Sequence, residues 1–330
     1  MFSSLLRLAD LAAVSAAAGM RLYEGGFGDR DELEALVRII EDRTIVDEDV
    51  AIDLELGPPV ETGGGQTLRA GRFLSPCAHR LPLESKHGLV ELVSPGGPRR
   101  AIVILLAATG EEGFWFRRRF AGALHDRGIA TLSLENAFYG ARRPAGQRAS
   151  LVRTVRDQFA MNVATVQEAR ALACWAKASG YEEVCLTGFS QGGLMASFAA
   201  SLTPFAVAVC PRGAGDAATP IFTNAALSRR IDWPRLARDL GGEPAARNYF
   251  EACLAPVRIS RFPAPFRARA AVLLGVEGDG FIPTSEVLAL HRHWPGAELR
   301  WLKSSHVLAA LLHGASHQRA ICDSLAQLST

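Results

Sequence analysis

The residues best suited to chemistry in this sequence centre on a serine between two glycines. Residues 188–192 read Gly-Phe-Ser-Gln-Gly, which fits the pattern G-x-S-x-G around Ser190. The preceding residues 183–187 predict a short buried strand, and residues 194–200 predict a helix. A tight turn between strand and helix lifts the serine hydroxyl clear of the sheet, and glycine leaves room for close backbone contact. The pattern predicts a nucleophile, with an ordinary glycine-rich turn as the alternative.

A serine hydroxyl is a poor nucleophile until a neighbouring base accepts its proton. Residues 270–276 and 297–302 predict the last two strands, and Asp279 and His306 follow them closely. Because carboxyl ends of parallel strands share one edge of a sheet, both side chains should lie beside Ser190. An imidazole titrates near neutrality and can take the proton, while the carboxylate would fix its tautomer. The chain order serine, acid, histidine therefore predicts a catalytic triad.

Other acids and histidines offer weaker alternatives. Glu277 is the nearest rival to Asp279 as the acid, and the sequence does not exclude it. His313 and His317 have a spacing that suits a metal ion, but no glutamate of an H-E-x-x-H motif accompanies them. We predict neither a metal site nor a required cofactor.

Two backbone N–H groups are expected to bind the oxyanion that forms during acyl transfer. One belongs to Gln191, directly after the nucleophile, at the start of the predicted helix. The second is expected in the loop after the apolar strand 101–107, where Thr109 or Gly110 is the candidate. An ordinary loop between strand and helix is an equal alternative.

Four further side chains are candidate substrate contacts because they lie near the same predicted edge of the sheet: Glu135, Tyr139, Phe189 and Trp115. A structural ion pair from Glu135 to Arg142 or Arg143 is the favoured interpretation of that glutamate. The basic run at residues 117–119 is expected to form a solvated face.

The remaining elements alternate between helix and strand, which predicts an α/β fold with a mostly parallel sheet. Further strands are predicted at residues 88–93, 129–134 and 205–210, and helices at residues 29–42, 114–127, 151–179, 284–293 and 316–328. Residues 56–66 are rich in turn formers and predict a surface loop. Residues 211–265 interrupt the alternation with predicted helices 225–238 and 245–253. Such an insertion above the strand ends could cover a pocket, lined by Arg229, Arg230, Trp233, Arg235 and Tyr249. Helices that only pack on the rim of the sheet are an equal alternative.

Composition narrows the functional classes. The chain has 330 residues, is 48% hydrophobic and carries a formal net charge of +2, which is typical of one large domain and disfavours a nucleic-acid binder. The 6 cysteines are scattered without a C-x-x-C motif and are expected to be reduced, as in a cytosolic protein. In residues 1–20, Asp10 interrupts an apolar run. A docked or interfacial helix is predicted there, with a signal peptide as the alternative.

Several longer stretches carry a resemblance to a known family. They are FLSPCAHRLPLES, LAATGEEGFWFRRR, LSLENAFYGARRP, TGFSQGGLMAS, IFTNAAL, EGDGFIP and WPGAELRWLKSSHVLA. At these residues the chain resembles the alpha/beta hydrolase domain-containing protein 18 family over most of its length. The resemblance implies an α/β-hydrolase fold, a triad of Ser190, Asp279 and His306, and hydrolysis of ester-linked acyl chains, including those of membrane lipids. Ala108, where glycine is expected, and Glu111-Glu112, where a pair with histidine is expected, depart from the family pattern.

The sequence therefore predicts a serine hydrolase that cleaves a small-molecule or lipid carboxylic ester through an acyl-enzyme on Ser190. A non-catalytic binding protein with the same fold and an acyltransferase are the alternatives. We expect one domain over residues 1–330, with a helical extension at 1–70 and a cap at 211–265. We expect a cytoplasmic location, with peripheral membrane contact as a variant of it. No nucleic-acid partner is expected, and the sequence leaves the oligomeric state open.

Overall fold

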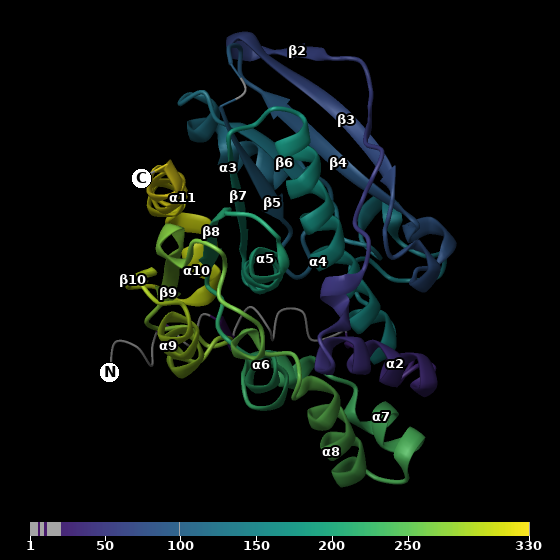
Figure 1. Ribbon diagram of the computed structural model, residues 1–330. Coiled ribbons are helices and arrows are strands. Elements are labelled where there is room, and N and C mark those ends of the chain that lie inside the picture. Colours follow the sequence, from purple (N-terminus) through teal and green to yellow (C-terminus); the bar gives the residue numbers. More distant parts are fainter. Residues whose placement is uncertain (1–5, 7–9, 12–20, 99, 330) are drawn as a thin grey trace.

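A computed structural model of the chain describes residues 6, 10–11, 21–98 and 100–329, and its elements surround one twisted sheet (Figure 1). The strands are β1 (Glu55–Leu56), β2 (Val60–Thr62), β3 (Gln66–Leu74), β4 (His87–Ser94), β5 (Ala101–Leu106), β6 (Ala130–Leu134), β7 (Glu183–Phe189), β8 (Ala208–Arg212), β9 (Val272–Val276) and β10 (Glu298–Leu302). The helices are α2 (Arg30–Glu41), α3 (Trp115–His125), α4 (Val155–Ala178), α5 (Gln191–Leu202), α6 (Thr219–Thr223), α7 (Trp233–Leu240), α8 (Glu243–Leu254), α9 (Thr284–His293), α10 (His306–Leu312) and α11 (Gly314–Ser329).

The sheet is mostly parallel, as predicted. Within the described residues the strand order is β1-β3-β4-β6-β5-β7-β8-β9-β10, with β2 paired to β3. The strands from β6 through β10 in this order are parallel, while β4 pairs antiparallel with β6 and β3. The carboxyl ends of β5, β7, β8, β9 and β10 consequently meet at one edge, where α/β proteins place their ligands.

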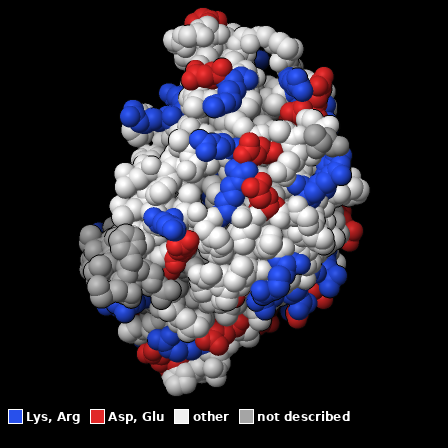
Figure 2. All heavy atoms as spheres, turned by 90° about the vertical axis from the view of Figure 1, so that its left-hand side faces the viewer, with Lys and Arg blue, Asp and Glu red and all other residues white. Residues whose placement is uncertain are grey.

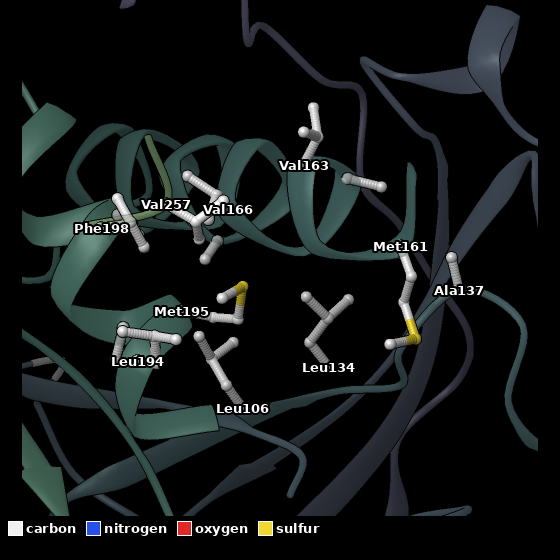
Figure 3. Close-up of a cluster of buried hydrophobic side chains, with 14 of the residues drawn as sticks. Leu106, Leu134, Ala137, Met161, Val163, Val166, Leu194, Met195, Phe198 and Val257 are labelled. Carbon is white, nitrogen blue, oxygen red and sulfur yellow. The ribbon is translucent and has the colours of Figure 1, made fainter. Parts of the chain in front are cut away.

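Strand β5 explains why helices cover both faces of the sheet. Every residue of this strand is buried, and successive side chains point to opposite faces. Ile102 and Ile104 join the core cluster that includes α4 and α5, whereas Val103 and Leu105 join the cluster that includes α3 and α11. Figure 3 shows side chains of β5, β6, α4 and α5 gathered in the first of these layers. Burial of each such side chain contributes about 1.5–3 kcal/mol.

The amino-terminal region differs from the predicted helical extension. Helix α2 forms as expected, and the Asp29 carboxylate accepts a hydrogen bond from Glu32 N at its start. Residues 55–70, however, contribute strands to the edge of the sheet, so the predicted surface loop at residues 56–66 is wrong where β2 pairs with β3. Glycines with positive φ close the β2–β3 hairpin, which local turn signals alone do not distinguish from a loop. Of the predicted helix 1–20, Leu6, Asp10 and Leu11 are described and helical; the rest lies outside the described residues.

The region between β8 and β9 holds three helices. Helix α8 confirms the predicted helix 245–253, α7 overlaps only the end of the predicted helix 225–238, and α6 was not predicted. Pro234 stands in the first turn of α7 and Gly241, in the left-handed conformation, ends it, which explains why this helix starts and stops later than its periodicity suggests. The ring of Phe250 on α8 packs edge-on against Tyr23, Phe222 and Trp233. These contacts dock the helices beside α2, as Figure 1 shows. The role of this region as a cap stays a prediction.

The surface combines both signs of charge. Figure 2 shows acidic and basic side chains interspersed on one face rather than gathered into a patch of one sign. Among the helices of the described residues, none combines the length and the apolar character needed to cross a membrane.

Candidate active site

Ser190 occupies a strained turn between β7 and α5. Its backbone adopts φ 55° and ψ −118°, a conformation that costs a non-glycine residue energy and is concentrated at functional sites. A Cβ added at Gly188 would lie 2.3 Å from the carbonyl carbon of Gly192, and one added at Gly192 would lie 2.5 Å from the oxygen of Leu106. The two glycines therefore permit the close contact that the sequence pattern predicts.

Asp279 and His306 form a buried pair beyond the ends of β9 and β10. Asp279 Oδ2 lies 2.7 Å from His306 Nδ1, and both side chains are less than a tenth exposed. Asp279 Oδ1 accepts two backbone hydrogen bonds, from Phe281 N and Ile282 N at 2.8 Å each. The carboxylate is thus fixed on both oxygens and favours the tautomer in which Nδ1 carries the proton. Glu277, the predicted rival, is exposed.

The imidazole of His306 is held between two aromatic rings. Its centroid lies 4.7 Å from that of Phe189 and 4.9 Å from that of Phe281. With Nδ1 engaged by the carboxylate, Nε2 is the nitrogen left without a hydrogen-bond partner among the described residues. His306 is the first residue of α10, a short helix that was not among the predicted elements.

Ser190 and His306 line the same cavity, which has a volume of about 890 Å³. Three of the four candidate substrate contacts, Trp115, Tyr139 and Phe189, also line it, whereas Glu135 does not. Further apolar lining comes from Phe116, Phe120, Leu194, Met195, Phe222 and Phe281. The cavity is therefore largely apolar beside the strained serine.

The predicted pocket residues of the 211–265 region are mostly elsewhere. Arg230 lines the cavity, but the other four residues do not. Arg235 pairs with Asp239 on its own helix α7, and the Tyr249 hydroxyl donates to Glu34 on α2, so both side chains are engaged away from the cavity. The larger apolar side chains that this region adds to the cavity wall, Ile221, Phe222 and Leu227, were not predicted.

The predicted pairing of Glu135 with Arg142 or Arg143 is wrong. The Glu135 carboxylate instead accepts from Gly113 N at 2.7 Å, and the Arg142 guanidinium donates to the backbone oxygen of Glu135 at 2.6 Å. Arg142 forms its ion pair with Glu168 of α4, and Arg143 pairs with Glu112. Glu135 thus braces the loops around the site without facing the cavity.

The basic run also departs from a simple solvated face. Arg117 is 5% exposed; it bonds Glu111 at 2.8 Å and donates to the backbone oxygens of Leu105 and Gly113. Its pKa is lowered by burial and raised by Glu111, which partly offsets that loss. The guanidinium ties the end of β5 to the loop that follows it.

The backbone N–H groups of the loop after β5 differ in whether they have a hydrogen-bond acceptor. Gly110 N donates to the Tyr139 hydroxyl at 3.3 Å, and Ala108 N donates to Glu111 at 3.0 Å. Thr109 Oγ1 donates to the Gln191 side-chain oxygen at 3.0 Å, which joins the loop to the serine turn. Within the described part of the chain, the backbone N–H groups of Thr109 and Gln191 have no acceptor, so of the two loop candidates Thr109 is the free donor.

Arg212 is a cavity residue that the sequence analysis missed. It ends β8, two residues beyond the predicted strand, because the strand continues through Pro211, where the sequence suggested a strand end. Its guanidinium is 6% exposed, lies 4.6 Å from the Phe120 ring centroid and donates to Thr187 Oγ1 at 3.2 Å. No carboxylate of the described residues forms an ion pair with it, and burial lowers its pKa.

His317 also faces the cavity, and a metal-binding role has no support in its contacts. Its Nε2 lies 2.9 Å from the oxygen of Ala309. Burial, together with the charge of Arg212, lowers the pKa of His317 to about 3, so the imidazole is neutral at physiological pH. The described residues contain no cluster of potential metal ligands.

Comparison with known proteins identifies the family and the fold. A sequence model of the family described as alpha/beta hydrolase domain containing 18 matches residues 20–252 and 242–327. Among solved structures, the chain is similar to an acetyl xylan esterase from Paenibacillus sp. R4, with 14% identity, a TM-score of 0.60 and coverage of 91% of this chain and 96% of that one.

Two further solved structures agree. Acetyl xylan esterase 1 from Thermoanaerobacterium sp. JW/SL YS485 shares 12% identity and a TM-score of 0.58, with 95% of this chain and 98% of that chain covered. Est1E from Butyrivibrio proteoclasticus, solved with ferulic acid bound, shares 15% identity and a TM-score of 0.50, with 82% and 100% covered. At such identities the likeness shows the fold alone, and the predicted α/β-hydrolase fold is confirmed.

Proposed function

Since the chain belongs to the alpha/beta hydrolase domain containing 18 family, we propose that it is a serine hydrolase of carboxylic esters. One observation carries the proposal: a buried Asp279–His306 pair opens into the same cavity as a serine held in a strained turn. The arrangement supplies a nucleophile, a base and a group that orients the base, which together define acyl transfer.

In the first step, Ser190 Oγ attacks the acyl carbon while His306 Nε2 accepts the hydroxyl proton. Asp279 holds the Nδ1 proton and stabilises the imidazolium that forms. The imidazolium then protonates the leaving alcohol, and the acyl group remains bound to Ser190. In the second step, water attacks with His306 as base, which releases the carboxylic acid and restores the serine.

The oxyanion of each tetrahedral intermediate would be bound by backbone N–H groups of Gln191 and Thr109. Both lack an intramolecular acceptor among the described residues, and the side chains of the two residues are hydrogen-bonded to each other. Such a donor typically contributes about 10²–10³-fold to kcat. Gly110, the other loop candidate, is occupied by Tyr139.

The cavity favours an ester with an extended apolar acyl group. Its volume is about 890 Å³, and aromatic and aliphatic side chains form most of its wall. The exposed side chains of Trp115 and Phe116, 63% and 52% exposed, continue the apolar surface at the cavity. A lipid acyl ester fits these features, and the esterases among the structural neighbours support ester cleavage as the reaction class.

Hydrolysis of p-nitrophenyl esters of graded acyl length tests this proposal. We expect turnover that rises with acyl length from acetyl and is abolished in Ser190→Ala. Thr109→Gly, which keeps the backbone N–H but loses the bond to Gln191, should lower kcat more than it changes KM. Equal turnover by wild type and Ser190→Ala would contradict the assignment of the nucleophile.

A further inference from the structure

The carboxylate of Asp10 lies between the two segments that carry the acid and the base. Its side chain is completely buried, although it comes from the first residues of the chain. Asp10 Oδ2 accepts from Gly280 N at 2.8 Å and from His306 N at 3.0 Å, and Oδ1 accepts from Val307 N at 3.0 Å. One side chain thus binds the turn after β9 and the start of α10.

These bonds complete the amino terminus of α10. A helix begins with N–H groups that have no partner within the helix, and buried ones need acceptors from elsewhere. In α10, the Ser305 side chain accepts from Leu308 N at 3.3 Å, and the Ser305 backbone oxygen accepts from Ala309 N at 2.8 Å. The remaining two N–H groups, one of them on the base itself, are satisfied by Asp10.

The same carboxylate completes the turn that carries Asp279. Asp279 Oδ1 accepts from Phe281 N and Ile282 N, and the intervening Gly280 N is taken by Asp10. Asp279 Oδ2 is then free to bind His306. Charge-assisted bonds of this kind are the stronger class of hydrogen bond, so Asp10 couples the backbone positions of both triad members.

The glycines on either side of Asp279 lie close to Leu6 and Asp10. A Cβ added at Gly278 would lie 2.7 Å from Leu6 Cβ, and one added at Gly280 would lie 3.0 Å from Asp10 Cβ. Neither glycine has a positive φ, so conformational freedom does not explain them. Close packing does: Leu6 and the oxygen of Ser304 approach Gly278, and Asp10 approaches Gly280.

We propose that Asp10 is a positioning residue for catalysis, which holds Asp279 and His306 at hydrogen-bonding distance through their backbones. The inference rests on the proposed function of the triad. Asp10 does not line the cavity and has no contact with the substrate side of the site. Asp10 therefore supports the two catalytic residues from a distant part of the sequence.

The test replaces Asp10 by asparagine, whose amide would turn an N–H donor toward N–H donors. We expect kcat/KM toward a p-nitrophenyl ester to fall by about 10- to 100-fold, mainly in kcat, because small misplacements of catalytic groups are costly. Asp29→Asn is the matched control, since the Asp29 carboxylate also accepts from a backbone N–H at a helix N-terminus, but at the start of α2. Gly280→Ala perturbs the same contact from the opposite side and should act in the same direction.

A second readout separates this proposal from the proposed function. The imidazole Nδ1 proton of His306, followed by NMR at a temperature where every variant is folded, reports the bond to Asp279 without turnover. We expect it to shift or broaden in Asp10→Asn and to be unchanged in Asp29→Asn. If the wild-type protein proves inactive and Asp10→Asn still shifts the Nδ1 resonance, the positioning role of Asp10 is supported and the hydrolase function is refuted. Unchanged kcat and an unchanged resonance in Asp10→Asn would overturn the proposal.

Discussion

Replacing Glu168 by glutamine should lower the free energy of unfolding by about 3–5 kcal/mol. Glu168 and Arg142 are both 0% exposed, and the guanidinium bonds the two carboxylate oxygens at 2.6 and 2.8 Å. Glutamine keeps the shape but removes the charge and turns an amide donor toward a guanidinium that has only donors. A cation would then be buried without its counter-ion, which accounts for the size of the effect.

The contacts of Arg142 also indicate how much stability its replacement should cost. Arg142 donates to the backbone oxygens of Glu135 and Ser85 at 2.6 and 2.8 Å in addition to its ion pair. Arg142→Met therefore leaves two carbonyl groups and one carboxylate without donors, so it should cost at least as much as Glu168→Gln. In the double variant the uncompensated charge is absent, and the two effects should fall short of their sum by about 1–3 kcal/mol.

A surface pair provides the matched control. Arg300 bonds Glu298 through two oxygens at 2.7 and 2.8 Å, but the side chains are 28% and 41% exposed. Glu298→Gln should lower the free energy of unfolding by less than about 1 kcal/mol, because water solvates the Arg300 guanidinium that remains. Urea unfolding of all variants, compared at equal slope, measures these differences. Equal losses for Glu168→Gln and Glu298→Gln would refute the argument from burial.

Three further predictions concern the site. Gly192→Ala should reduce esterase activity by more than about 100-fold, because the new Cβ would lie 2.5 Å from a β5 carbonyl oxygen; Gly122→Ala, in open space on α3, should instead leave activity intact and raise the unfolding midpoint. His317 has a folded pKa of about 3 against 6.5 for an ordinary histidine, so as pH falls through this window the unfolded chain binds the proton and stability declines by about 1.4 kcal/mol per unit. His317→Gln should therefore show a smaller drop in melting temperature between pH 7 and pH 5 than wild type, and an equal drop would contradict the burial argument. Tyr139→Phe removes the acceptor of Gly110 N and should lower kcat several-fold with little change in KM; a change confined to KM would mean that the hydroxyl serves the substrate alone.

The parts of the fold that follow local rules could be predicted from the sequence. Hydrophobic runs such as β5 and the apolar repeat along α4 are properties of neighbouring residues, so their type and order were correct. The structure also brings Asp279 and His306 together, because chain order and strand ends already restrict where such residues can lie.

Contacts between distant segments could not be predicted in this way. Asp10 binds Gly280 and His306, which are 270 and 296 positions away in the sequence. The residues next to Asp10 in the sequence do not distinguish a buried acceptor from a break in an apolar run. The partner of Arg142 was misassigned for the same reason: Glu135 is closer in sequence, but packing of α4 brings Glu168 to the guanidinium. Strand β3 lies beside the short strands β1 and β2, most of its residues are half-buried or exposed, and its pairing depends on the neighbouring β4.

Reaction with a fluorophosphonate probe tests the central claim most directly. Wild-type protein, Ser190→Ala, His306→Ala and Asp279→Asn, each checked for folding, would be treated and the modified residue located by mass spectrometry. We expect stoichiometric labelling of Ser190 in wild type, none in Ser190→Ala, and labelling slowed by orders of magnitude in the other two. A folded wild type that does not react, or that reacts equally well without His306, would contradict an activated serine at this site.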